Sequence, residues 1–140
     1  MQAAAAIIEA GGFAVKVESS GIAHSAETWL DFARNSHLNA AHPAFVIYVT
    51  GSETYSCGMH VLGLPDAIMN SDDSDNAVEL LRVFTHYVFA EEPEIRSQQT
   101  FSAGPNEPGY RLTHERPGLY EVDDLFHNPN GYWRLTPLSA

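Results

Sequence analysis

Length, composition and charge set clear limits on this protein. The chain has 140 residues, 44% of them hydrophobic, which predicts one globular domain over residues 1–140 and excludes a disordered chain. Its one cysteine, Cys57, excludes internal disulfides and any cysteine-rich zinc or iron–sulfur site made by this chain alone. The net charge of −11 disfavours binding to nucleic acids and anionic membranes; it would keep the protein in solution or attract a basic protein partner.

The N-terminal segment shows no signal for export or membrane insertion. The first residues, MQAAAAIIEAGGFAVKV, lack a basic region and include Glu9, so they do not match a secretory signal. No apolar run approaches the roughly 20 residues that span a membrane. We therefore expect a soluble, cytoplasmic protein of a bacterial type.

Two helices and a strand are predicted in the first quarter of the chain. Residues 2–10 are strong helix formers, and Gly11-Gly12 supply a C-terminal stop. Apolar residues alternate in FAVKVESS, residues 13–20, which predicts a strand. A second helix is predicted over residues 24–37 with Ser25 as its N-cap. Its buried face would hold Trp29, Phe32 and Ala33.

A buried strand and the clearest helix follow. The run AFVIYVTG, residues 44–51, is almost wholly apolar and predicts a central strand, which residues 53–60 would continue after a turn. Residues 70–94 predict a helix whose acidic start suits the helix dipole and which Pro93 ends. Its core positions are predicted at helical spacing: Ala77, Leu80, Leu81, Phe84, Tyr87 and Val88.

The last third of the chain predicts hairpins. Residues 109–122 place Arg-Pro-Gly between two strand-like runs, and residues 124–138 contain Asn130-Gly131, a strong hairpin-turn signal. Residues 102–109, SAGPNEPG, have the composition of a loop. The whole pattern predicts an α+β fold: a mixed or antiparallel β-sheet with about three helices packed on one face, in a ferredoxin-like (split βαβ) variant with C-terminal hairpins.

The segment SETYSCGMHVLGLPDAIM, residues 52–69, brings candidate catalytic or metal-binding residues closest together in the sequence. In a strand, Cys57 and His60 would lie on opposite faces, whereas in a helical turn they would lie together. We interpret the segment as a bend in a buried sheet, with Gly58 and Gly63 permitting positive φ angles and Cys57 as a buried thiol. The alternative is a nucleophilic or metal-binding Cys-His pair with Asp66 as the orienting group.

Part of this segment carries a resemblance to a known family. TYSCGMHVLGLPDAIM resembles the pattern Thr-x-Gly-Met-x-x-Leu-Gly-x-Pro-Glu/Asp, followed by a short strand, of a bacterial family catalogued as domain of unknown function 4261. IIEAGGFAVKVESSGIAHS upstream, Trp29, and the helix after the motif are also similar, so the resemblance covers about residues 3–90. The chain departs from the pattern at Ser56-Cys57. The resemblance implies a fold and leaves the function open, because the family has no assigned activity or catalytic residues.

The seven histidines form no ligand pair at helical spacing and no His-Glu-x-x-His motif. His37 and His42 flank a predicted loop, where a surface metal contact stays open. The run DDSD lacks the glycine and distal glutamate of a calcium loop, so we assign its charge to a helix start. We predict no cofactor and no resident metal. A spatial histidine cluster also stays open, from His24, His60, His114 or His127.

Two functions from different classes fit these observations. The first is a non-catalytic binding or interaction module with an acidic surface, of an immunity-like or regulator-like kind, that binds a basic protein partner. It depends on the net charge and on the lack of catalytic motifs, and it leaves a homo-oligomer open. The second is a small hydrolase or metal-dependent enzyme with a cluster of His24, Cys57, His60 and Asp66.

Overall fold

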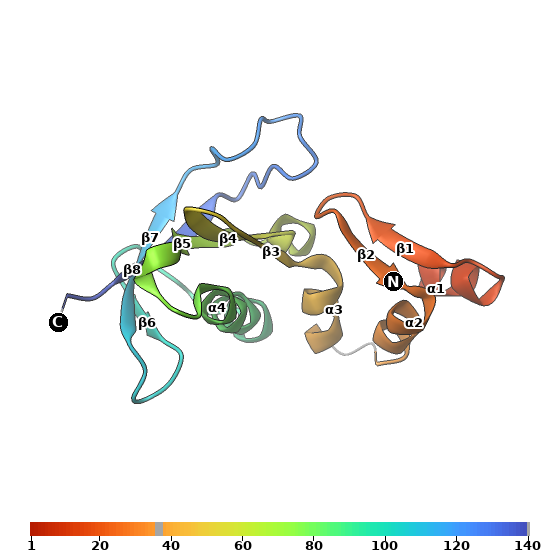
Figure 1. The fold of residues 1–140 in the computed structure, drawn as a ribbon, viewed down its shortest axis with the longest axis horizontal. Coiled ribbons are helices and arrows are strands. Elements are labelled where there is room, and N and C mark those ends of the chain that lie inside the picture. The colour runs from red at the N-terminus through yellow and green to blue at the C-terminus, as the bar shows by residue number, and fades with distance from the viewer. Residues whose placement is uncertain (36–37, 140) are drawn as a thin grey trace.

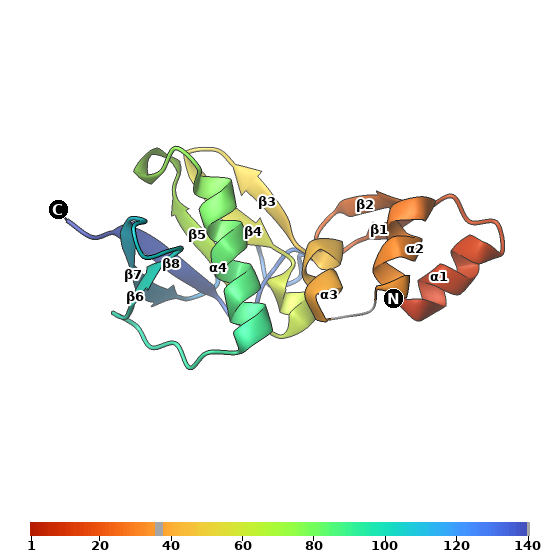
Figure 2. The same ribbon diagram turned by 90° about the horizontal axis from the view of Figure 1, so that it is seen from below.

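The computed structural model describes residues 1–35 and 38–139, which form two unequal β-sheets and four α-helices. The N-terminal elements are α1 (Gln2–Glu9), β1 (Ala14–Val17), β2 (Ile22–Ser25), α2 (Ala26–Arg34) and α3 (Leu38–Phe45). They are followed by β3 (Ile47–Thr50), β4 (Glu53–Cys57), the 3-10 helix η1 (Met59–Leu62), β5 (Asp66–Asn70), the 3-10 helix η2 (Ser71–Asp73), α4 (Ala77–Glu91), β6 (Thr100–Ser102), β7 (Gly109–Glu115) and β8 (Tyr132–Pro137). Figures 1 and 2 show the β1–β2 hairpin with α1 and α2 at one end, the large sheet with α4 at the other, and α3 between them.

The large sheet is mixed, which confirms the predicted α+β class. Its strand order is β3-β4-β5-β8-β7-β6. Strands β5 and β8 are adjacent and parallel, and every other neighbouring pair is antiparallel. In a split βαβ unit another strand would separate the parallel pair. Here α4 and the β6–β7 hairpin lie between β5 and β8 in the chain, and β8 returns directly beside β5. The strand order therefore differs from that of a split βαβ unit.

Helix α4 supplies the main core. It packs against β3, β4 and β5, and its buried face is the one that the helical spacing predicts, except that Tyr87 is exposed and Thr85 is buried as well. The Tyr87 side chain is 39% exposed, because it lies over Phe101 at the margin of the sheet, where the strands are short. The helix ends at Glu91, and its C-cap residue, Glu92, adopts a left-handed conformation directly before Pro93.

The remaining helices build a second, smaller core. Helices α1 and α2 pack together, α2 packs on the β1–β2 hairpin, and α3 contacts both α2 and α4. Ser25 accepts a hydrogen bond from the Thr28 amide, which confirms the predicted N-cap. The helices are therefore shared between two sheets, because α2 packs on the hairpin and α1 packs on α2, whereas α4 packs on the large sheet. This second core contains Ala5, Val17, Trp29, Ala33 and Ala44.

Two boundaries in the N-terminal half differ from the prediction. Residues 22–25 form β2 and pair with β1, where a loop and a helix start were expected. Residues 44 and 45 belong to α3, so the strand predicted over residues 44–51 begins only at Ile47. LNAAHPAF combines three alanines with Pro43 and therefore has no strong local preference, and the hydrophobic pattern did not separate it from the β-branched run that follows.

The two hairpins predicted after residue 109 are wrong in detail. Strand β7 pairs with β8, but residues 116–131 between them form turns and contain no strand. Asn130-Gly131 therefore closes no two-residue hairpin. Gly131 has a φ of +79°, and a side chain there would collide with the Glu115 carbonyl oxygen. Its own carbonyl accepts a hydrogen bond from the Asp66 amide at the β5–β8 contact. The predicted loop at residues 102–109 does connect β6 to β7.

Gly58 offers a test of the bend between β4 and η1. It has a φ of +119°, and a Cβ atom would collide with the Phe45 carbonyl oxygen and lie 3.2 Å from the Ser20 Cβ. Gly63 at the other end of η1 has a φ of +76°, with no atom of the described residues within 4 Å of an added Cβ.

We expect Gly58→Ala to lower the free energy of unfolding by about 3 kcal/mol or more, because both strain and collision act there. Gly63→Ala carries only the cost of the left-handed conformation, about 1 kcal/mol. Urea denaturation of the two variants measures the difference, and equal losses would contradict the collision.

Candidate functional site

The segment around Cys57 is a strand followed by a helical turn, so it combines the two predicted alternatives. Strand β4 ends at Cys57, Gly58 reverses the chain, and η1 carries His60. The Cys57 side chain is 3% exposed, and its Sγ atom lies 3.9 Å from the Ser19 carbonyl oxygen. Burial, with the nearby carboxylates of Asp66 and Asp124, raises the pKa of this thiol to about 12. The sulfur therefore stays protonated at neutral pH and is a poor nucleophile.

Asp66 is the best-connected polar residue among the four candidates. It is 1% exposed, and its Oδ1 atom accepts hydrogen bonds from the Ser56 hydroxyl (2.7 Å) and the Met59 amide (3.2 Å). Its Oδ2 atom accepts one from Asn128 Nδ2 (2.7 Å), which also donates to the Leu64 carbonyl (2.9 Å). Burial raises the pKa of Asp66, and the three hydrogen bonds oppose that shift. Its carboxylate thus joins β4, η1 and the β7–β8 connection.

The two predicted histidines lie in separate surroundings. His24 Nε2 lies 2.8 Å from the Ala44 carbonyl oxygen, and its ring contacts Trp29 and Phe32. His60 Nε2 lies 3.1 Å from the Leu125 carbonyl oxygen, to which it donates, while its buried Nδ1 has no hydrogen-bond partner in the described residues. No hydrogen bond joins His24, Cys57, His60 and Asp66 to one another in the part of the chain that the structure describes.

The other histidines also contact separate partners. His114 Nε2 lies 2.9 Å from the Asn130 carbonyl oxygen, and His127 Nδ1 lies 3.1 Å from the Tyr120 carbonyl oxygen. His37, which we considered with His42 for a surface metal contact, lies outside the described residues. His42 itself is buried against α4. Over residues 1–35 and 38–139, no three His, Cys, Asp or Glu side chains come together in a way that could hold a metal ion.

His42 belongs to a buried hydrogen-bond network between α3, β3 and α4. Thr85 Oγ1 donates to the Leu81 carbonyl (2.8 Å), so it can accept from Tyr48 (2.8 Å) and from His42 Nε2 (2.9 Å). This arrangement places the His42 proton on Nε2. Burial, with His86 and Arg82 nearby, lowers the pKa of His42 to about 4, so the ring is neutral at physiological pH.

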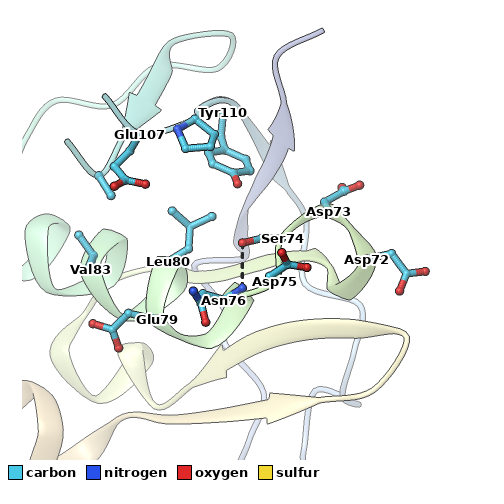
Figure 3. A pocket seen from close by; sticks show the side chains of 12 residues that line it. Asp72, Asp73, Ser74, Asp75, Asn76, Glu79, Leu80, Val83, Glu107 and Tyr110 are labelled. Carbon is cyan, nitrogen blue, oxygen red and sulfur yellow. Dashed lines mark hydrogen bonds between the residues drawn. The ribbon is translucent and has the colours of Figure 1, made fainter. Parts of the chain in front are cut away.

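An acidic groove lies at the start of α4, as Figure 3 shows. Its volume is about 610 Å³, and it runs between η2 and α4 on one side and the β6–β7 loop on the other. Leu80, Val83 and Tyr110 form its apolar part. Its five carboxylates come from both sides of the groove: Asp72, Asp73, Asp75, Glu79 and Glu107.

The charge of this groove is largely uncompensated. None of its lining residues is Lys, Arg or His. Glu79 pairs with Arg82 at 3.0 Å, and the other four carboxylates form no ion pair with the described residues. Asp72, Asp73 and Asp75 precede α4, where the helix dipole favours negative charge and accounts for part of the cluster. Glu107 arrives from the β6–β7 loop, and that dipole does not explain its position.

Sequence reasoning identified Asp66 and missed its partners Ser56 and Asn128. Ser56 and Thr54 lie on the same side of β4, and both are fully buried. Only a known sheet register reveals that small polar residues are buried on this side. Asn128 lies in the connection that was predicted to be part of a hairpin. The acidic run before α4 was visible in the sequence, but its meeting with Glu107 depends on the tertiary fold.

Replacing Asp66 with Asn tests the buried network. All three neighbours donate to Asp66, so an amide would aim its own NH2 group at one of them. We expect a loss of about 2–4 kcal/mol in the free energy of unfolding. Asp73→Asn, at an exposed position, should change it by less than about 0.5 kcal/mol. Chemical denaturation at neutral pH compares the two variants. An unchanged free energy of unfolding in Asp66→Asn would contradict the network.

His42 should make the stability pH-dependent. Its folded-state pKa is lower than the unfolded value, so the unfolded chain binds more protons between these values and stability falls as the pH falls. From about pH 7 to about pH 5 we expect a loss of about 1–2 kcal/mol from this residue. Denaturation across this range should show a correspondingly smaller loss in His42→Gln, whereas His114→Gln, at an exposed position, should keep the wild-type dependence. Identical curves for all three proteins would contradict this account.

Comparisons with family models, curated proteins and solved structures found no match to this chain. The resemblance to domain of unknown function 4261 therefore stays a prediction. None of the helices that the structure describes is both long enough and apolar enough to cross a membrane.

Proposed function

We propose that this protein is a non-catalytic binding module that holds a basic segment of a partner protein in the acidic groove at the start of α4. The observation that carries the proposal is that five acidic residues from two separate segments line one groove with an apolar floor, and only one of the five is ion-paired in the described structure. Lysine or arginine side chains would bind at the rim, and an apolar residue of the partner would contact Leu80 and Val83.

The charge of the chain supports a basic protein over other classes of ligand. A net charge of −11 repels nucleic acid phosphates and anionic lipid surfaces. The buried Cys57 remains a free thiol, which is compatible with the reducing cytoplasm of a bacterium. A regulator-like or immunity-like role, with a basic protein as its target, agrees with both properties.

An enzyme that uses His24, Cys57, His60 and Asp66 has less support. Each of these side chains has a different hydrogen-bond partner, and three of them bond to backbone carbonyls. Asp66 accepts from three donors and has no hydrogen bond to a histidine. A nucleophile–base pair needs such a contact, or at least access to solvent.

A titration with synthetic peptides tests the groove. Peptides that place lysine or arginine beside one apolar residue should shift the NMR amide signals of residues 72–80, Glu107, Gly109 and Tyr110, and added salt should weaken binding. Matched acidic peptides should not bind.

The variant Asp75→Asn/Glu107→Gln should weaken binding of the basic peptides about tenfold, because it removes one carboxylate from each side of the groove. Glu9→Gln/Glu27→Gln makes the same change in net charge on α1 and α2 and serves as the control. Equal effects of the two variants, or shifts outside the groove, would contradict the proposal.

A further inference from the structure

The connection between β7 and β8 exposes large apolar side chains. Residues 116–131 are longer than most connections in a compact domain, and loops of this size without secondary structure often carry function. Val122 is 83% exposed and Leu125 is 62% exposed, and Leu119 is exposed beside them. Figure 1 shows this connection standing out from the large sheet and extending toward the β1–β2 hairpin. It lies at the opposite end of β7 from the acidic groove.

The backbone that carries these side chains is held firmly. The Tyr120 hydroxyl lies 2.8 Å from that of Tyr55, and its ring packs against Phe126. The ring of Phe126 also lies over Gly21 of the β1–β2 turn. The Leu125 carbonyl accepts from His60, and Asn128 is bonded to Asp66.

Local hydrogen bonds shape the tip of the same connection. The Asp124 amide donates to the Glu121 carbonyl (3.0 Å), and Asp124 Oδ1 accepts from the Phe126 amide (2.8 Å). Val122 and Leu125 are therefore presented by an ordered backbone, and little conformational entropy would be lost when they bind.

The charges around the apolar tip select the partner. Glu121, Asp123 and Asp124 flank Val122 and Leu125, and residues 117–126 contain no Lys or Arg. Glu121 and Asp123 form no ion pair with the described residues. An anionic membrane would be repelled by these carboxylates, and so would a second copy of a chain with net charge −11.

We propose that the β7–β8 connection is a docking surface that inserts Val122 and Leu125 into an apolar pocket of a basic protein, whose Lys or Arg side chains pair with Glu121 and Asp123. The two aliphatic side chains are the central anchors, and the carboxylates form the polar rim that speeds association and excludes other partners. This surface is separate from the acidic groove and does not depend on it.

Selection from a phage-displayed library of random peptides, both linear and disulfide-constrained, tests the surface directly. We expect the peptides that bind the whole chain to combine a large apolar residue with Lys or Arg. Their affinity should fall about tenfold or more for Val122→Ser/Leu125→Ser. It should also fall for Glu121→Gln/Asp123→Asn, and the wild-type affinity should decrease as salt is added. All four positions are exposed, so thermal unfolding should confirm that the variants keep the native fold.

Two further arms separate this surface from the alternatives. The groove variant Asp75→Asn/Glu107→Gln should leave the loop-dependent peptides bound as before; if only this variant weakens binding, the proposal for the loop is overturned and the groove is supported. Vesicles containing phosphatidylglycerol should not sediment the protein. Sedimentation that depends on Val122 and Leu125 would overturn the proposal in favour of a membrane, and a selection that yields no loop-dependent peptide would also overturn it.

Discussion

The structure depends on keeping the carboxylate of Asp66 satisfied in the interior. It lies at the first residue of β5, beside β8, where it accepts from a side chain of β4, an amide of η1 and the amide group of Asn128. An ionised group that loses such partners inside a protein costs several kcal/mol. Segments that are far apart in the chain are therefore held together by one side chain. Two glycines near this point, Gly58 and Gly131, let the backbone pass close to the carbonyl oxygens of Phe45 and Glu115.

Hydrogen bonds, in this network and elsewhere, also involve the polar residues that the sequence offered for catalysis. The polar groups that looked reactive in the sequence, Cys57, His60 and Asp66, contact protein atoms and connect structural elements. Carboxylates without an ion-pair partner in the described structure lie on the surface instead, in the acidic groove and at the tip of the β7–β8 connection. Strand β7 joins these two regions. Tyr110, near the start of the strand, lines the groove, and the connection to β8 begins after Glu115, the last residue of the strand. Both regions combine apolar contacts with carboxylates, as expected of a surface for basic partners.

Local patterns predicted much of the fold. The helix at residues 77–91 was recognised because its apolar residues recur at helical spacing and acidic residues precede it. The N-cap at Ser25 and the stop after α1 follow from side-chain and glycine chemistry within one turn. The errors at residues 22–25, at α3 and after residue 115 share a different cause. Short segments such as LNAAHPAF or DLFH have weak local preferences, and their state is decided by what they pack against.

The sequence by itself determined the α+β class, the long helix with its buried face, the acidic character of the chain and the bend at Gly58, because these properties arise from neighbouring residues and from composition. Only the tertiary structure decided that β8 lies beside β5, that Asn128 and Ser56 bind Asp66, and that Glu107 faces the acids before α4. Each of these contacts joins residues that are well separated in the chain, and hydrophobic periodicity contains no information about which distant strands will pair. Sheet register supplies that information, and it exists only once the chain has folded.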